Sequence, residues 1–156
     1  MAGSCRVNFK DLENFRENLE KSLGSEEIDA FIESCAKELA ARLLAKVIKR
    51  TPVGQHPKGT GKVGGTLRRG WTGGKSQNAT AYAQSLKVHH FGDVYVIEVI
   101  NPVEYAPYVE FGHRTRGGKG WVEGRFMLTI SEQEIEADAP RVLENKLKKK
   151  LGGCFK

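Results

Sequence analysis

Cysteine is scarce in this chain of 156 residues and follows no pattern. The three cysteines, Cys5, Cys35 and Cys154, are odd in number and far apart, and no Cys-x-x-Cys or Cys/His ligand spacing is present. We therefore expect neither a disulfide framework nor a structural metal site. Cys35 falls on the apolar face of an amphipathic segment, where we expect a small buried hydrophobic residue.

Long apolar runs are missing as well. The sequence has no stretch of 18 apolar residues, so we predict no membrane-spanning helix and no membrane partner. The first residues also lack the apolar core of a secretory signal peptide. We therefore expect synthesis and assembly in the cytoplasm.

Carboxylates are absent from one long part of the chain. Between Glu38 and Asp93 there is no Asp or Glu, although ten Lys and Arg residues lie there, whereas residues 11–38 hold nine carboxylates against three Lys or Arg. The formal net charge is +6. Such a charge distribution can attract DNA or an acidic protein surface, or can pair the acidic side of one subunit with the basic side of the next.

The length and the ordinary hydrophobic content predict one domain spanning residues 1–156. Leu12, Phe15, Leu19 and Leu23 indicate a short amphipathic helix over residues 10–23, so residues 1–24 form an N-terminal helical extension. The core then covers residues 25–151. A second helix begins near Ser25, which we expect as its N-cap, and ends at Thr51 because Pro52 disfavours helical geometry in the preceding residue.

Two glycine-rich segments interrupt the core. Residues 54–74 contain eight glycines in 21 positions, and residues 112–124 form a second basic, glycine-rich segment. Ordering a chain costs about 1–2 kcal/mol per residue, and few apolar side chains are present to offset that cost. We expect both loops to be mobile in the free monomer and to become ordered at an interface.

Three strands are expected between and around these loops, at residues 67–72, 79–91 and 94–100. The third has apolar residues on both faces, which predicts a central strand covered on both sides, with Glu98 as an exception. A helical turn at residues 105–111 and a C-terminal helix from about Gly124 follow, the latter bent near Pro140 or divided there by an Asp138 cap. The fold class is therefore α+β, with a small antiparallel sheet packed against a long helix in the N-terminal half and a C-terminal helix.

The sequence contains no complete catalytic or nucleotide-binding motif. Gly59-Thr60-Gly61-Lys62 resembles a phosphate-binding loop, but His56 stands where the first glycine is required and Val63 where Ser or Thr is required. His89 and His90 are adjacent on an expected strand, so they face opposite sides and cannot share a metal site. We expect no cofactor, no metal and no enzymatic activity.

Several charged and aromatic residues remain open to more than one interpretation. Glu110, His113 and Arg114 are expected to form a hydrogen-bond and charge network that pins the loop, with part of it available for contacts between subunits. Arg68, Arg69 and Trp71 either meet phosphates of a nucleic acid or are divided between solvent and core. Trp121 either anchors an interface or folds back onto the sheet.

Five short segments in fixed order resemble a known family. Thr51-Pro52-Val53 is followed by Leu67-Arg68-Arg69-Gly70-Trp71, and later by Asn101, by Tyr105-Ala106-Pro107-Tyr108-Val109-Glu110-Phe111-Gly112-His113-Arg114, and by Phe126-Met127-Leu128. Over roughly residues 26–131 this order resembles a family of small tail-completion and head–tail joining proteins of long-tailed bacteriophages. The long link from Gln55 to Gly65 departs from the family, whose members often have a short Asp-Thr-Gly connection there.

The resemblance implies a structural protein of the virion tail or neck, assembled in the host cytoplasm. It implies a ring of identical subunits, for which we expect a hexamer, in contact with connector, tail-terminator or tail-tube proteins and, loosely, with DNA in the channel. A basic nucleic-acid-binding accessory protein is the alternative. The assembly contacts that we expect are Arg68, Arg69, Trp71, Tyr105, Tyr108, Glu110, His113, Arg114, Arg116 and Trp121.

Overall fold

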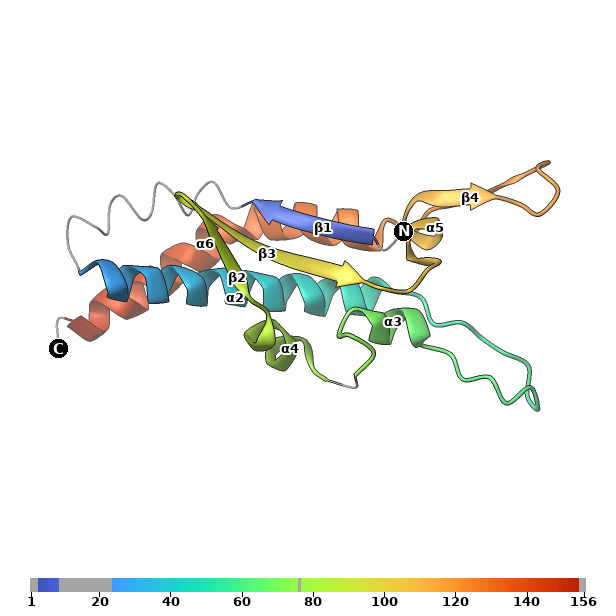
Figure 1. The fold of residues 1–156 in the computed structure, drawn as a ribbon, viewed down its shortest axis with the longest axis horizontal. Coiled ribbons are helices and arrows are strands. Elements are labelled where there is room, and N and C mark those ends of the chain that lie inside the picture. Colours follow the sequence, from blue (N-terminus) through green and yellow to red (C-terminus); the bar gives the residue numbers. More distant parts are fainter. Residues whose placement is uncertain (1–2, 9–23, 76, 155–156) are drawn as a thin grey trace.

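The fold was determined as a computed structural model, which describes residues 3–8, 24–75 and 77–154. Two long helices, α2 (Ser25–Arg50) and α6 (Met127–Cys154), run side by side along the molecule. A small sheet lies along them, and two chain segments project from the end of the molecule where α2 finishes (Figure 1). This arrangement of helices with small antiparallel sheets confirms the α+β class. The helix expected at residues 10–23 lies outside the described residues.

Helix α2 is the centre of the core because its apolar residues recur at helical spacing. Its buried residues are Ile28, Phe31, Ile32, Cys35, Ala36, Leu39, Ala40, Leu43, Leu44 and Val47. The expected burial of Cys35 is confirmed. The helix ends at Thr51 as predicted, but the N-cap is Gly24, and Ser25 is already the first helical residue, so the N-cap prediction was wrong by one position.

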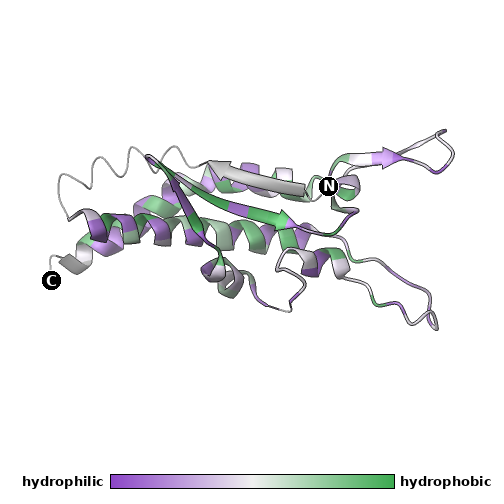
Figure 2. Cartoon of the chain, in the orientation of Figure 1, coloured by the Kyte–Doolittle hydropathy of each residue, from purple (hydrophilic) through white to green (hydrophobic). Residues whose placement is uncertain are grey.

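The main sheet has the strand order β1-β3-β2, with β1 at Gly3–Asn8, β2 at Val88–Phe91 and β3 at Val94–Asn101. All neighbours are antiparallel: Gly3 pairs with Asn101, and Phe91 pairs with Val94. The central position of β3 is confirmed, and Figure 2 shows its strongly hydrophobic character. The prediction that both faces of β3 are covered was wrong. One face is buried, with Tyr95, Ile97, Val99 and Asn101, whereas the residues that alternate with them are half-buried or exposed.

Two of the three expected strands differ from the structure. Residues 67–72 are helical instead, in α3 (Thr66–Gly70), because Leu67 and Trp71 are four residues apart and both point into the core. The segment 79–91 begins as helix α4 (Ala79–Ser85), whose N-cap Asn78 accepts a hydrogen bond from the Ala81 amide at 2.7 Å. Only its last four residues form a strand, β2.

The second half of the chain alternates short elements with one long helix. Helix α5 (Ala106–Phe111) confirms the expected helical turn, with Pro107 in its first turn. It leads into a hairpin of β4 (Gly112–Arg114) and β5 (Trp121–Glu123), so Trp121 lies on a strand and not in the expected loop. Helix α6 continues through Pro140 without a second cap at Asp138, whose carboxylate is paired with Arg141 at 3.2 Å.

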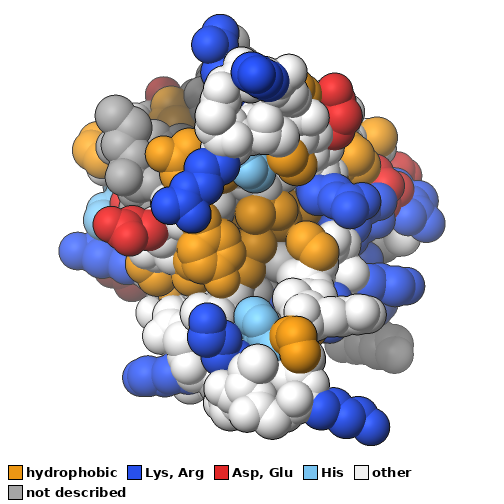
Figure 3. Space-filling view, turned by 90° about the vertical axis from the view of Figure 1, so that its right-hand side faces the viewer, with side chains coloured by type: hydrophobic (Ala, Val, Ile, Leu, Met, Phe, Trp, Pro, Cys, Tyr) orange, Lys and Arg blue, Asp and Glu red, His pale blue; other side chains and the backbone are white. Residues whose placement is uncertain are grey.

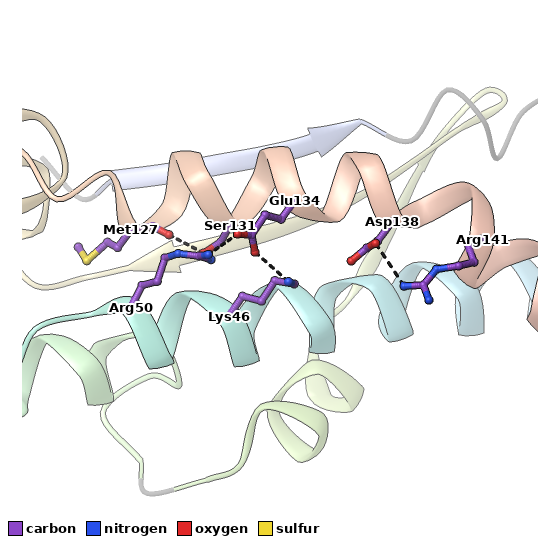
Figure 4. Close-up of polar contacts among 7 residues, drawn as sticks. All are labelled: Lys46, Arg50, Met127, Ser131, Glu134, Asp138 and Arg141. Atoms are coloured by element: carbon purple, nitrogen blue, oxygen red, sulfur yellow. Dashed lines mark hydrogen bonds and ion pairs between the residues drawn. The ribbon is translucent and has the colours of Figure 1, made fainter.

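A polar cluster joins the two long helices near the projecting end. Lys46 donates to Glu134 Oε2 at 2.8 Å, and Arg50 bonds the other oxygen of the same carboxylate and donates to Ser131 Oγ at 3.0 Å (Figure 4). Ser131 in turn donates to the Met127 carbonyl at 2.6 Å. Helix α6 is thereby held to the last two turns of α2, so the projecting end of the molecule rests on a braced pair of helices.

Candidate assembly surface

The residues that carry the sequence resemblance fall into two groups at this end of the molecule. One group is buried and holds the chain segments together, and the other is exposed on the surface above it. Only the exposed residues are available to another molecule.

Thr51 makes the central hydrogen bonds of the buried group. Its hydroxyl donates to the Val47 carbonyl at 2.6 Å and accepts a hydrogen bond from Trp71 Nε1 at 2.8 Å. Its carbonyl accepts from Arg68 Nε at 3.2 Å and Nη2 at 2.8 Å. Because Thr51 is fully buried, these bonds satisfy polar groups that solvent does not reach. They fix α3 against the end of α2 and leave the intervening loop to project.

Asn101 joins α3 to the sheet. Its amide nitrogen donates to the Leu67 carbonyl at 2.8 Å, and its Oδ1 accepts from the Val103 amide at 3.1 Å. Gly70 lies directly against this side chain, where a Cβ would collide with Asn101 Oδ1. Glycine at position 70 is therefore required for α3 to approach β3 closely.

Glu110 serves as a cap for the start of α6. Its two carboxylate oxygens accept hydrogen bonds from the Leu128 and Thr129 amides, each at 2.9 Å, and Oε1 also accepts from Thr129 Oγ1 at 2.7 Å. A carboxylate at a helix N-terminus satisfies free amides and interacts favourably with the helix dipole. The expected network of Glu110 with His113 and Arg114 was therefore wrong: Glu110 binds α6 instead.

The exposed group, which we call the end face, consists of apolar side chains on α5, the hairpin and the segments around them. Its members are Val53, Val63, Tyr105, Tyr108, Phe111, Trp121, Val122 and Phe126, which range from 39% to 77% exposed. Figure 3 shows apolar side chains gathered between two lobes of the surface, with Lys and Arg side chains around them. A hollow of about 250 Å³ lies under the loop at residues 52–65, lined by Val53, Val63, Tyr105 and Val109 among others.

Cations surround the end face. Lys58 and Lys62 lie on the loop at residues 52–65, Arg114, Arg116 and Lys119 lie on the hairpin, and all five are exposed. An apolar centre with a charged rim is typical of surfaces that bind another protein, and Tyr, Trp and Arg are the residues that most often dominate such binding.

His113 lies at the edge of the end face and is half-buried. Its ring contacts Tyr108 edge-on, with 5.9 Å between ring centroids. Its Nδ1 is buried and has no hydrogen-bond partner among the described residues. The side chain thus packs against an aromatic neighbour and is not oriented by a carboxylate, as an acid–base catalyst would be.

Of the ten expected contact residues, the structure brings Tyr105, Tyr108, His113, Arg114, Arg116 and Trp121 together at this end. Arg69 is exposed near the loop and donates to the Gly64 carbonyl at 3.3 Å. Trp71 and Glu110 are buried and Arg68 is bonded to Thr51, so these three have internal roles in this fold. We did not predict from the sequence that Phe111, Val122 and Phe126 belong to the exposed surface. Phe111 follows Glu110 on α5, and because Glu110 faces the interior, Phe111 is exposed.

His89, His113 and the buried Cys35 lie on separate elements of the fold. His89 lies on β2 and His113 on β4, in separate sheets. No group of three His, Cys, Asp or Glu residues able to hold a metal ion occurs in the described ranges. Burial raises the pKa of the Cys35 thiol to about 11, which leaves it protonated and unreactive at neutral pH.

A hollow of about 730 Å³ lies between α2 and α6. Burial acts to raise the pKa of Glu38 in its wall, but hydrogen bonds and charges from Lys146 and Arg42 outweigh burial and lower it. Lys146 and Arg42 lie 3.0 and 3.1 Å from this carboxylate. Glu38 is thus paired with two of the cations in the wall, whose lining has an excess of Lys and Arg over carboxylates.

The fold and the end face together define a small α+β protein whose buried polar network supports an exposed aromatic, cation-rimmed surface. The chain belongs to the HK97-gp10-like family, described as "Bacteriophage HK97-gp10, putative tail-component", whose model matches residues 13–112. That match includes Thr51, Arg68, Trp71, Asn101 and Glu110. No curated protein and no solved structure matches the chain.

Membership in a family of bacteriophage tail components supports a structural role in the virion. In the described part of the chain, no helix has the combination of length and apolarity needed to cross a membrane.

Proposed function

We propose that this chain is a tail-completion or head–tail connector subunit that forms a ring at the junction of head and tail. Its end face then meets neighbouring subunits or the adjoining connector, tail-terminator or tail-tube proteins. The observation that carries the proposal is the end face itself: eight apolar residues are exposed at the end of the molecule that the buried network holds rigid.

The physical argument is the cost of leaving this surface in water. Single exposed apolar side chains are common, but apolar side chains gathered at one end of a molecule mark an interaction site. Burying apolar area stabilises by roughly 25 cal/mol per Å², and aromatic anchors contribute most at the centre of an interface. A head-to-tail contact joins two different surfaces of each subunit, and it closes into a ring when the rotation between successive subunits completes a full turn.

The test is the mass of the assembled particle. Size-exclusion chromatography with light scattering, on the chain alone and with a candidate tail-tube protein, should give a closed oligomer in at least one case. A persistent monomer in both cases, at concentrations up to about 100 µM, would contradict the proposal, since stable interfaces form well below that range.

A nucleic-acid-binding role is the second candidate, supported by the exposed cations Lys58, Lys62, Arg114, Arg116 and Lys119. Binding through phosphates weakens steeply with salt because counterions are released on contact. Tight DNA binding with a steep salt dependence by a monomeric chain would favour this candidate, and weak binding erased by 150 mM salt would favour assembly.

A further inference from the structure

The hairpin at residues 112–123 carries an exposed tryptophan and three exposed cations. Arg114 and Trp121 are a cross-strand pair, so both side chains lie on one face of the hairpin. Arg114, Arg116, Lys119, Trp121 and Val122 are all exposed, and a two-stranded hairpin alone is only marginally stable in water. The hairpin carries three cations and one carboxylate, a formal charge of +2 with His113 neutral.

The first half of α6 has the opposite character. Residues 127–140 contain four carboxylates and no Lys, Arg or His, a formal charge of −4. Glu134 is bound to Lys46 and Arg50, and Asp138 to Arg141, but Glu132 and Glu136 make no ion pair with a described residue. The exposed residues beside them include Ile130, Gln133, Ala137 and Pro140, which give an acidic stripe with apolar positions.

The hairpin and the acidic stripe of one subunit point in opposite directions. The hairpin extends outward from the end of the molecule, whereas α6 runs back along the body (Figure 1). A hairpin therefore reaches an acidic stripe only on another molecule. Because the two surfaces differ, their contact is head-to-tail and can close into a ring.

We propose that the hairpin of one copy docks across the acidic stripe of α6 on the next copy, with Trp121 as its apolar anchor and Arg114, Arg116 and Lys119 facing Glu132 and Glu136. This inference rests on the proposed function and names the contact that builds the ring. Opposite charges at such a contact fix its register and speed association, while the indole supplies buried area.

The test uses two full-length variants with opposite charge changes. The hairpin variant is Arg114→Glu/Arg116→Glu/Lys119→Glu, and the stripe variant is Glu132→Lys/Glu136→Lys. Each alone places like charges at the contact and should weaken assembly at least tenfold. A 1:1 mixture restores opposite charges at every contact, so it should assemble, with native mass spectrometry showing equal numbers of the two variants. The control Lys148→Glu/Lys149→Glu, at the far end of α6, should assemble like the wild type.

The outcomes separate this contact from the proposed ring. Variants that assemble alone like the wild type, or a mixture that stays monomeric although both variants unfold at the wild-type temperature, would overturn this contact while leaving the ring intact. A wild-type chain that never assembles would overturn the proposed function as well. Should a variant fail to fold, Thr115→Cys/Gln133→Cys in a chain with Cys5 and Cys154 changed to Ser supplies the second measurement. A bis-maleimide should then link copies only when both cysteines are present, and an absence of linked copies would overturn the contact.

Discussion

The indole nitrogen of Trp71 donates a hydrogen bond of 2.8 Å to the hydroxyl oxygen of Thr51, and both residues are buried. The bond joins the end of α2 to α3 across 20 residues of sequence. The residue before Pro52 thus ends a helix, bonds the Trp71 indole and accepts Arg68 on its carbonyl. The loop between Thr51 and α3 can be long because its two ends are fixed by these bonds.

Breaking this bond from either side should have coupled effects. We expect Thr51→Val and Trp71→Phe each to lower the free energy of unfolding by about 1–3 kcal/mol, since Thr51→Val leaves a buried N–H without an acceptor. The double variant should cost less than the sum by about 1 kcal/mol, because the second change removes the same bond. Urea unfolding of all four proteins measures this coupling, and strictly additive losses would show that the bond contributes nothing.

The Glu110 carboxylate should stabilise α6 as a cap. Glu110→Ala leaves the Leu128 and Thr129 amides without acceptors, and we expect a loss of about 2 kcal/mol in the free energy of unfolding. Glu110→Gln keeps one acceptor oxygen and should lose less. The exposed neighbour change Glu104→Ala should alter stability by no more than about 0.5 kcal/mol. Equal stability of the Glu110 and Glu104 variants, measured by thermal unfolding, would refute the capping role.

The ion pairs that Lys46 and Arg50 of α2 make with Glu134 of α6 should make the free energy of unfolding depend on pH. Hydrogen bonds from Lys46 and Arg50 lower the pKa of Glu134 below its ordinary value. A lowered folded-state pKa stabilises the fold above the unfolded pKa of about 4.3, and that contribution is lost as the pH falls through the folded value. Glu134→Gln should therefore be less stable than the wild type at pH 7, and the difference should shrink below about pH 4.

The control for this pH effect is Glu104→Gln, because Glu104 is exposed and lies outside the acidic stripe of α6. Chemical unfolding at pH 7, 5 and 3.5 compares the three proteins. A constant gap between Glu134→Gln and the wild type at all three values would show that the ion pairs are not the source of the difference.

Much of the fold could be predicted because its signals are local. The apolar stripe of α2, its end before Pro52, the strand at 94–101 and the turn of α5 all follow from periodicity and from proline. Strand β1 gave no such signal, since its strand character comes from pairing with β3. Its partner lies nearly 100 residues away in the sequence, which a local pattern does not reveal.

The errors at α3 and α4 have a common physical cause. Loose alternation over residues 79–91 suggested a strand there, whereas the four-residue spacing of Leu67 and Trp71 and the Asn78 cap were the stronger helical signals. The partner of Glu110 could not be read from the sequence, because α6 begins 17 residues later and the loop between them brings the two together. Tyr105, Tyr108 and Trp121 were expected among the assembly contacts, and all three are exposed, but their role in assembly stays a prediction.

We propose the end face as the surface through which copies meet, and the mass of the particle formed by a Tyr108→Ser/Trp121→Ser variant tests this most directly. Both side chains are more than half exposed, so the variant should unfold like the wild type. The account predicts that it stays monomeric while the wild type and the control Phe91→Ser, an equally exposed aromatic on β2, form the oligomer. An oligomer of unchanged mass and stability from Tyr108→Ser/Trp121→Ser would contradict it.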